Sequence, residues 1–301
     1  MPERDKNKNV SDRRRLPPWM RKRIRESESV VALKRALRGK RLHTVCESAG
    51  CPNITQCFQK PTATFMILGN ACTRNCRFCG VPKGKPQPLD PDEPRHLAEA
   101  AKTLELKHVV ITSVTRDDLE DGGADQFAKS VHALHHILPN ASTETLIPDF
   151  QGSDASLKTV LDSGVDILNH NVETVPRLYG TIRPEADFNR SVNVLKRAKD
   201  LRSDVMTKSG LMVGLGETFD EVMDVLRALA DVACDAVTIG QYLPPSHCHV
   251  PVKEYVHPDI FNKFREEGEK LGFKWVHAGP YVRSSFNAEE LMYKVKGIER
   301  E

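Results

Sequence analysis

The sequence has no run of about 18 apolar residues, the length that reads as a membrane-spanning helix, and no charged, apolar and small-residue pattern of a secretory signal. We therefore expect a cytoplasmic protein that does not work in a membrane. Its 301 residues allow one large α/β domain or two smaller ones. In such a chain the eight cysteines are expected to be reduced thiols used for metal binding or chemistry rather than disulfides.

The net charge is small, at +3, but it is unevenly distributed. Residues 1–26 contain ten Lys or Arg and four Asp or Glu, so ten minus four gives this segment +6 and leaves −3 for the remainder. A transit peptide would be poor in acidic residues, whereas Glu3, Asp5, Asp12 and Glu26 interrupt this one. We expect a basic arm, which is either a solvated tail or an arm that steers an acidic protein partner or nucleic acid to the body.

From residue 62 onward, β-rich apolar segments alternate with helical patterns, which is typical of a parallel sheet covered by helices. The expected strands are 62–69, 108–114, 142–148, 166–172, 209–215 and 236–243. After the fifth strand, Thr218 and Glu221 form a capping-box pattern, and an apolar stripe runs from Phe219 to Leu229. Six such units predict an α/β fold with a partial (βα)6 TIM-type barrel, to which residues 273–279 could add a seventh strand.

The same patterns predict three parts of the chain. Residues 1–61 form an N-terminal extension with the basic arm and a cluster-binding loop, residues 62–272 form the barrel, and residues 273–301 form a C-terminal extension. In parallel α/β barrels the chemistry lies on the loops that leave the C-terminal ends of the strands. Polar and charged residues gather in those loops here, so we expect the site on that face.

Three cysteines occupy the short loop after the first expected strand: Cys72, Cys76 and Cys79, with the spacing C-x3-C-x2-C. Three thiolates at this spacing can converge on one iron-sulfur cluster, and a four-iron cluster held in this way keeps one iron without a protein ligand. A substrate or cofactor could bind that iron. A structural zinc site needs four ligands and usually shows paired C-x2-C spacings, so zinc is the weaker interpretation.

A second set of three cysteines precedes the first strand: Cys46, Cys51 and Cys57, with the spacing C-x4-C-x5-C. This set again suggests a cluster that is short of one cysteine ligand. Neither of the two remaining cysteines is well placed in the sequence to complete it.

Cys234 is expected to be a buried core residue. Cys248 lies between His247 and His249 in a proline-rich loop, and these three side chains could bind a metal. A solvated turn is the stronger interpretation of that loop.

Segment 71–80, ACTRNCRFCG, resembles the signature of the radical S-adenosylmethionine superfamily, and the two cysteine spacings in this order resemble the lipoyl synthase family. The resemblance extends from Pro17 to Ala288. It depends on the segments LHTVCESAGCPNITQCF, TATFMILGNACTRNCRFCGV, ITSVTRDDLEDGGADQFA, NHNVETVPRLYGTIRPEADFNRS, TKSGLMVGLGET and GPYVRSSF. Such a set is far more specific than any single motif.

The resemblance implies that the first cysteine set holds a four-iron cluster whose open iron binds S-adenosylmethionine. An electron from this cluster breaks a carbon-sulfur bond of the cofactor and yields a 5'-deoxyadenosyl radical, with Phe78 beside the adenine. Polar residues at strand ends are further candidates for cofactor contacts, because arginine can hold a carboxylate, and acidic or amide groups suit hydroxyls and an ammonium group. These candidates are Thr115, Asn171, Glu173 and Arg183.

The resemblance also implies an auxiliary four-iron cluster on Cys46, Cys51 and Cys57, with a fourth ligand from an Arg-Ser-Ser-Tyr motif that falls here on Ser285. An alkoxide is a harder ligand than a thiolate and suits iron-sulfur clusters less well. A weak fourth bond is easily released, which fits a cluster that gives up its own sulfurs to the product. From the residues alone, Ser284 and Ser285 would be interpreted as a capped turn.

The implied reaction inserts two sulfur atoms at carbons six and eight of an octanoyl chain carried by a lysine of a lipoyl carrier domain. Implied partners are the octanoylated domains of 2-oxoacid dehydrogenase acyltransferase subunits and of the glycine cleavage H protein, a ferredoxin or flavodoxin as electron donor, and an iron-sulfur carrier. No membrane or nucleic acid partner is expected. Met66, Leu68 and Met212 are candidates for an apolar tunnel that holds the chain, although barrel filling explains them equally well.

The sequence departs from the family pattern at Phe286, where tyrosine is usual, at His277, where a small residue is common, and in SHCHVPV at residues 246–252. These departures are expected near the auxiliary cluster and the substrate entrance. Two alternatives stay open. One is another radical sulfur-inserting enzyme with a different alkyl substrate, and the other is a zinc-stapled binding protein that uses its basic arm on nucleic acid.

Overall fold

The computed structural model describes residues 16–21, 42, 44–48, 50–57 and 62–291, so most of the expected basic arm lies outside the described residues. The described part is built on one sheet of seven parallel strands in the order β1 to β7, so each strand pairs with its neighbour in sequence. Within the described residues β1 and β7 do not pair with each other, and the sheet stays open. This arrangement confirms a partial TIM-type barrel.

The strands lie close to their predicted positions; all are shorter than predicted except β5, which begins three residues earlier. Their bounds are β1 Thr62–Ile67, β2 His108–Ser113, β3 Ser142–Leu146, β4 Ile167–Asn169, β5 Met206–Val213, β6 Ala236–Gln241 and β7 Trp275–Gly279. The additional strand β7 pairs with β6 from Ala236↔Trp275 to Gly240↔Gly279. The sheet therefore has seven strands, one more than the six expected units, and β7 joins the barrel from the segment expected to be a C-terminal extension.

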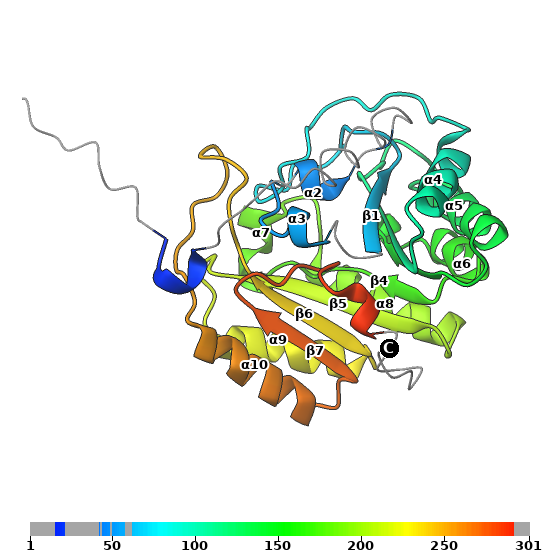
Figure 1. The fold of residues 1–301 in the computed structure, drawn as a ribbon. Helices are drawn as coiled ribbons and strands as arrows, with labels where there is room; N and C mark the ends of the chain where they lie inside the picture. Colours follow the sequence, from blue (N-terminus) through cyan, green and yellow to red (C-terminus); the bar gives the residue numbers. More distant parts are fainter. Residues whose placement is uncertain (1–15, 22–41, 43, 49, 58–61, 292–301) are drawn as a thin grey trace, which may run out of the picture.

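Helices cover the outer face of the sheet, with α4, α5 and α6 on one flank and α9 and α10 on the other (Figure 1). The longer helices are α4 Glu93–Thr103, α5 Ala124–Ile137, α6 Asp154–Asp162, α8 Phe188–Leu201, α9 Phe219–Asp231 and α10 Pro258–Lys270. The short helical turns are η1 Pro18–Met20, α2 Val45–Ser48, α3 Ile54–Cys57, η2 Phe150–Gly152, η3 Pro176–Leu178 and α7 Tyr179–Ile182.

Helix α9 shows how local sequence sets these elements. The Thr218 hydroxyl accepts a bond from the Glu221 backbone N–H, and the Glu221 carboxylate accepts one from the Thr218 N–H, which confirms the predicted capping box. The buried stripe consists of Val222, Met223, Leu226 and Leu229. Phe219 is not part of this buried face, because its side chain is 38% exposed and stacks on Phe264 of α10 with ring centroids 4.9 Å apart.

Replacing Thr218 by alanine is expected to lower the free energy of unfolding by about 1 kcal/mol, because the change removes the side-chain acceptor of the cap. Thr159, exposed on α6, serves as a control, and Thr159→Ala is expected to change stability by less than about 0.5 kcal/mol. Urea unfolding followed by circular dichroism measures both values. Equal changes in the two variants would contradict a specific capping effect.

Inside the barrel, charged side chains form a buried network. The Lys208 ammonium on β5 donates to both carboxylate oxygens of Glu144 on β3 at 3.0 Å, and both side chains are 0% exposed. His108 Nε2 lies 3.7 Å from the Glu144 carboxylate, and the Asn169 amide donates to it at 2.7 Å. Burial would raise the pKa of Glu144, but Lys208, His108 and Asn169 outweigh it and lower the pKa to about 2.

Two contacts cross the open edge of the sheet. The Asn53 amide donates to the Tyr281 carbonyl at 2.6 Å, and the Thr62 hydroxyl donates to the Glu289 carboxylate at 3.2 Å. Residues 53 and 62 therefore contact residues 281 and 289 where the sheet stays open.

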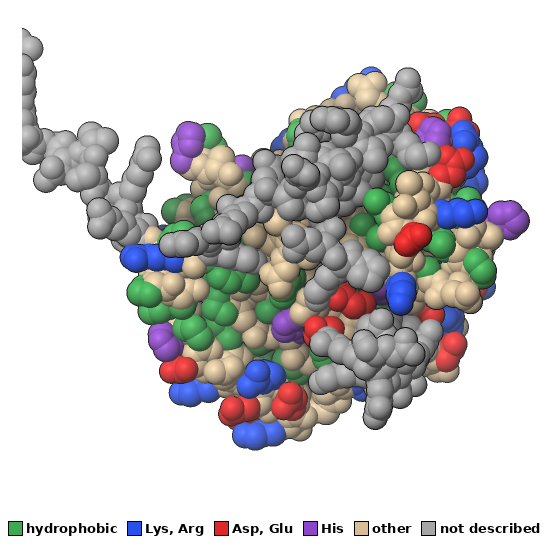
Figure 2. Space-filling model, in the orientation of Figure 1, with side chains coloured by type: hydrophobic (Ala, Val, Ile, Leu, Met, Phe, Trp, Pro, Cys, Tyr) green, Lys and Arg blue, Asp and Glu red, His purple; other side chains and the backbone are tan. Residues whose placement is uncertain are grey.

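Within the described residues, no helix is both long and apolar enough to cross a membrane. On the face shown in Figure 2, Lys and Arg side chains are interspersed with Asp and Glu. The described residues of this face thus present mixed charge rather than a basic surface.

Candidate active site

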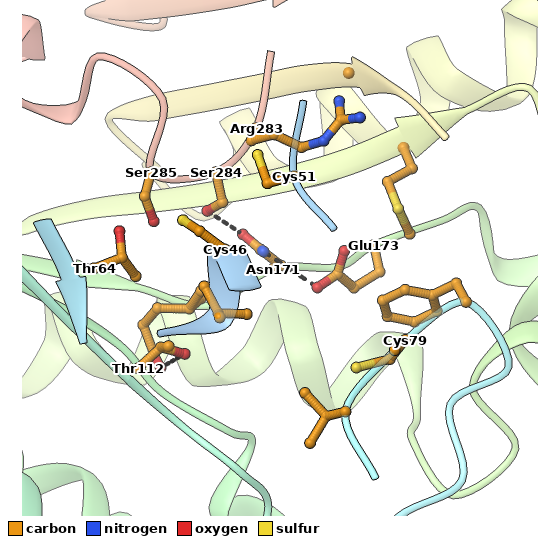
Figure 3. Close-up of a pocket in the computed structure, with 18 of the residues that line it drawn as sticks. Cys46, Cys51, Thr64, Cys79, Thr112, Asn171, Glu173, Arg283, Ser284 and Ser285 are labelled. Atoms are coloured by element: carbon orange, nitrogen blue, oxygen red, sulfur yellow. Dashed lines mark hydrogen bonds between the residues drawn. The ribbon is translucent and has the colours of Figure 1, made fainter. Parts of the chain in front are cut away.

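A cavity of about 560 Å³ lies at the C-terminal ends of the strands and extends into the barrel. Its wall includes both predicted cysteine sets: Cys46, Cys51, Cys57, Cys72, Cys76 and Cys79. It also includes the other predicted site residues: Phe78, Thr115, Asn171, Glu173, Arg183 and Ser285. Residues that the sequence placed in five separate segments therefore line one shared space, part of which is shown in Figure 3.

The first cysteine loop follows β1 and is held by contacts to its backbone. The Lys83 ammonium donates to the carbonyl oxygens of Cys76 and Cys79, both at 3.0 Å. The backbone N–H of Thr115 donates to the Cys72 sulfur at 3.4 Å. Burial raises the pKa of Cys76 to about 11 and also raises the pKa of Cys79. These two thiols are therefore protonated near neutral pH without metal, and cluster binding must displace their protons.

Arg74 fixes the same loop to the neighbouring strands, and the sequence analysis did not single it out. This side chain is 5% exposed and donates to both carboxylate oxygens of Asp117 at 2.6 and 2.9 Å, and to Asp149 at 2.6 Å. Asp117 follows β2 and Asp149 follows β3, so Arg74 joins three strand ends. The acidic residues after β2 indicated that Asp117 could lie at the site. No local sequence pattern indicated that Arg74 would bind Asp149.

The region after β4 brings Asn171, Glu173 and Arg183 together. The Asn171 amide donates to the Glu173 carboxylate at 3.2 Å, and the Arg183 guanidinium donates to the carbonyl oxygens of Asn171 and Val172, both at 3.1 Å. Glu173 has a φ of 65°, which is unfavourable for a side chain of this kind, and burial raises the pKa of its carboxyl group. Strained backbone conformations and buried acids with shifted pKa values are often found at functional sites, and Glu173 has both properties.

His170 also lines the cavity and was missed by the sequence analysis. Its Nδ1 lies 2.9 Å from the Ile147 carbonyl, its side chain is 2% exposed, and burial lowers its pKa to about 4. The ring is therefore neutral near pH 7, with Nδ1 as the donor and Nε2 as an acceptor. Nε2 has no hydrogen-bond partner among the described residues, so it offers an acceptor to a ligand.

The second cysteine set lies on and beside the short helices α2 and α3. The thiol of Cys46 is hydrogen-bonded to Cys51, and this bond, burial and the neighbouring Cys51 and Cys57 raise the pKa of Cys46 well above its usual value. The three sulfurs are thus close enough to influence one another. Cys51 lies beside Arg283, the side chain whose pKa is lowered by burial (Figure 3).

Residues 281–287, here called the C-terminal segment, pack directly on β6. A Cβ added to Gly240 would lie 2.1 Å from the carbonyl oxygen of Val282, so only glycine allows this approach. The segment then places Ser284 and Ser285 on the cavity wall, on the side of Cys46 and Cys51 (Figure 3). Ser285, the predicted fourth ligand of the second set, therefore lies on the same cavity wall as that set, together with Ser284.

Two departures from the family pattern contact each other. The ring centroids of His277 and Phe286 are 5.7 Å apart, and those of Trp275 and His277 are 5.1 Å apart. Phe286, which lacks the usual tyrosine hydroxyl, thus packs against the His277 ring. A small residue at position 277 would not provide this contact.

The remaining cysteines behave as expected. Cys234 is 4% exposed, and burial raises its pKa to about 12, whereas Cys248 is exposed in a turn. His249 does not join Cys248, because its Nε2 lies 3.1 Å from the Cys79 carbonyl and its Nδ1 lies 2.9 Å from the Ser246 hydroxyl. The loop therefore packs on the first cysteine loop.

Three cysteines in each set match the ligand type of an iron-sulfur cluster. Zinc needs its ligand atoms within about 2.3 Å of one point. The described residues contain no group of three His, Cys, Asp or Glu side chains placed to bind one ion. In a four-iron cluster each thiolate binds a different iron, so the sulfurs surround a larger body rather than one point.

One candidate for the apolar tunnel is wrong. Met66 and Met212 line the cavity, but Leu68 does not. β1 ends at Ile67 and Leu68 has a φ of 69°, which breaks the strand alternation. Its side chain packs on Gly123 at the start of α5, where an added Cβ would come within 2.3 Å of it.

Comparison with known proteins shows which families the sequence matches. Residues 66–229 match the radical SAM superfamily, and residues 2–51 match the N-terminal domain of lipoyl synthase of the radical SAM family. Lipoyl synthase of Caldanaerobacter subterraneus subsp. tengcongensis is 56% identical, over 91% of this chain and 96% of that protein. Lipoyl synthase of Nitratidesulfovibrio vulgaris strain Hildenborough is 52% identical, over 93% of this chain and 94% of that protein.

Solved structures share the fold at low identity. Methylornithine synthase superposes with a TM-score of 0.55 at 15% identity, covering 92% of this chain and 90% of that one. The [FeFe]-hydrogenase maturase HydG gives 0.56 at 16% identity, covering 84% and 62%. These likenesses support the open barrel alone, whereas the identity to curated relatives extends over nearly the whole chain. The chain therefore belongs to the lipoyl synthase family of radical S-adenosylmethionine enzymes.

Proposed function

We propose that this chain inserts two sulfur atoms at carbons six and eight of an octanoyl chain bound to a lysine of a carrier protein. The observation that carries the proposal is that two separate three-cysteine sets line one cavity, with polar candidates for cofactor contacts on its wall. One cluster would be enough for radical formation. A second set beside the same cavity is what an enzyme that also delivers sulfur needs.

Two four-iron clusters are proposed for these sets. The radical cluster is assigned to Cys72, Cys76 and Cys79, and the auxiliary cluster to Cys46, Cys51, Cys57 and Ser285. When bound, S-adenosylmethionine with the first cluster supplies a 5'-deoxyadenosyl radical, and the auxiliary cluster supplies sulfur. The proposed division of the chain follows these roles, with 1–61 holding the auxiliary set, 62–272 the radical site and 273–301 Ser285.

Residues at the strand ends are proposed to bind and orient S-adenosylmethionine. The buried carboxyl group of Glu173 and the amide of Asn171 suit ribose hydroxyls or the ammonium group. Arg183 is held by two backbone carbonyls, and its Nε has no partner among the described residues, which leaves it available to a carboxylate. Phe78 is proposed to pack beside the adenine, and Thr115 to line the same pocket.

The walls of the cavity are proposed to exclude water and to hold the alkyl chain. A primary alkyl radical abstracts hydrogen from almost any nearby carbon. The protein must therefore hold the target carbon next to the radical and keep other groups away from it. Met66 and Met212 contribute apolar surface to the cavity, where the octanoyl chain could lie between the two cysteine sets.

The proposed partners are those that the family resemblance implies. They are octanoylated carrier domains of 2-oxoacid dehydrogenases and of the glycine cleavage H protein, a ferredoxin or flavodoxin that delivers electrons, and an iron-sulfur carrier that rebuilds the auxiliary cluster. Neither nucleic acid nor a membrane is proposed as a partner. Six reduced thiols are needed as ligands, which agrees with the cytoplasm expected from the sequence.

The decisive experiment is a lipoylation assay with anaerobically reconstituted protein, an octanoylated carrier domain, S-adenosylmethionine and dithionite. We expect mass spectrometry to show the dihydrolipoyl carrier, with about two molecules of 5'-deoxyadenosine per product because two carbons are functionalised. Samples without reductant are the control. An unchanged octanoyl carrier, together with sulfur insertion into another alkyl substrate, would favour the alternative sulfur-inserting enzyme.

The metal content separates the proposal from the zinc-binding alternative. Two four-iron clusters give about eight iron and eight sulfide per chain. Zinc without a brown chromophore would favour a zinc-stapled binding protein, and steeply salt-dependent binding of nucleic acid would support it further.

A further inference from the structure

The hydroxyl group of Ser284 bridges two asparagines near the C-terminal end of β4. It donates to the Asn171 side-chain oxygen at 3.0 Å and accepts from the Asn169 amide at 2.8 Å. Ser284 is thus tied to a strand 113 and 115 positions earlier in the chain. A hydroxyl has one donor and two acceptor sites, so these bonds use the donor and one acceptor site.

The bridge continues in two directions. Asn171, with its oxygen occupied by Ser284, donates its amide to Glu173 at 3.2 Å, and Figure 3 shows this row of Ser284, Asn171 and Glu173. Asn169 donates to Glu144 at 2.7 Å, the carboxylate that is paired with Lys208. One hydrogen-bonded chain therefore runs from the buried ion pair, through Ser284, to the carboxyl group proposed to contact the cofactor.

Ser285, the next residue, is held differently. Among the described residues its hydroxyl has no hydrogen-bond partner, so no side-chain bond of its own fixes its direction. Its position follows from the residues that precede it, where the Val282 carbonyl packs on Gly240 and Ser284 is bonded to Asn169 at the end of β4. Ser284 therefore provides a hydrogen-bonded anchor directly next to the candidate ligand.

We propose that Ser284 is a positioning residue that couples the cofactor end of the cavity to the candidate ligand Ser285 at the auxiliary end. A ligand that fixes the side chains of Asn171 and Glu173 keeps the Asn171 oxygen in place as the acceptor of the Ser284 hydroxyl. The hydrogen bond between Ser284 and Asn171 then restrains the C-terminal segment. By reciprocity, an ordered segment holds Asn171 in the orientation that binds the cofactor. This inference rests on the proposed function, because it uses the proposed roles of Asn171, Glu173 and Ser285.

Hydrogen exchange of the wild-type protein tests the coupling directly. Reconstituted protein is compared with and without S-adenosylmethionine, in the absence of reductant so that the cofactor is not cleaved. We expect the cofactor to slow exchange of the amides at residues 281–287 about threefold or more. Unchanged exchange in this segment, under conditions where the cofactor is bound, would overturn the proposal.

Two variants that each remove one hydrogen-bonded serine hydroxyl sharpen the test. Ser284→Ala leaves the buried Asn171 oxygen without its donor, so we expect cofactor affinity in equilibrium dialysis to fall about tenfold and the exchange response to disappear. Ser163→Ala serves as the control, because it removes a buried hydroxyl that donates to the Val160 carbonyl at 2.6 Å just after α6 and does not line the cavity, so affinity within about twofold of wild type and a retained exchange response are expected. Similar behaviour of the two variants would overturn a specific role of Ser284.

The outcomes separate this inference from the proposed function. Wild-type protein that neither binds S-adenosylmethionine nor converts the octanoyl carrier would remove the proposed function, and the coupling with it. Wild-type protein that does both, with Ser284→Ala retaining full affinity and the exchange response, would overturn the coupling alone.

Discussion

Protein with Cys76→Ala is expected to lose cleavage of S-adenosylmethionine to the background level. Cys76 supplies one of three thiolates to the proposed radical cluster, and a cluster with two protein ligands has no stable site for the cofactor. The measurement is 5'-deoxyadenosine formed by reconstituted protein with dithionite and an octanoylated carrier. Sulfur insertion is expected to disappear as well, because it depends on the radical.

Cys51→Ala is expected to give a different pattern, in which 5'-deoxyadenosine still forms while no lipoyl product appears. The first cysteine loop is held by Lys83 and Arg74, and these bonds do not involve Cys51. Cys248→Ala serves as the control, because this exposed cysteine belongs to neither set and both activities should be retained. Equal losses of cofactor cleavage in Cys51→Ala and Cys76→Ala would contradict separate roles for the two sets.

Lys208→Met is expected to lower the free energy of unfolding by about 3–5 kcal/mol at neutral pH, because it leaves the buried carboxylate of Glu144 without its cation. Both side chains are 0% exposed, so water cannot replace the lost partner. Urea unfolding of wild type and variant with equal cluster content measures the difference. The expected loss is a large fraction of the stability of an ordinary domain.

An exposed ion pair provides the matched control. Lys158 and Asp162 lie 2.5 Å apart on α6, but their side chains are 60% and 62% exposed. Solvent screens such a pair, so Lys158→Met is expected to change the unfolding free energy by less than about 1 kcal/mol. A loss as large as that of Lys208→Met would show that burial is not the cause.

The same buried pair gives a pH dependence with a defined sign. The pKa of Glu144 is about 2 in the folded protein, against 4.5 for the free side chain. Because the folded pKa is the lower one, the stabilisation is complete above pH 4.5 and is lost as the pH falls toward 2. The difference between wild type and Lys208→Met should therefore be largest at neutral pH and shrink in acid. A constant difference would contradict the ion pair as its source.

The predictions that the structure confirms depend on residues close together in the sequence. Apolar alternation located six of the seven strands and indicated the seventh as a possibility, and the capping box of α9 joins Thr218 to a residue three positions later. Predictions failed where a tertiary contact changed the local rule. In the sequence, Leu68 continues the apolar pattern of the first strand. In the structure its backbone is left-handed, with a φ of 69°, and its side chain packs against Gly123.

By itself, the sequence determined the parallel α/β architecture, the two cysteine spacings and the family. Only the tertiary structure decided which residues distant in sequence contact one another in and around the cavity. Examples are the hydrogen bonds that Arg74 donates to Asp149 and that Ser284 donates to Asn171. The physical reason is that periodicity and spacing act within a few turns of chain. The partner of a buried polar group depends instead on how strands far apart in sequence are placed, because burial leaves each donor only the acceptors that the folded barrel brings within about 3 Å.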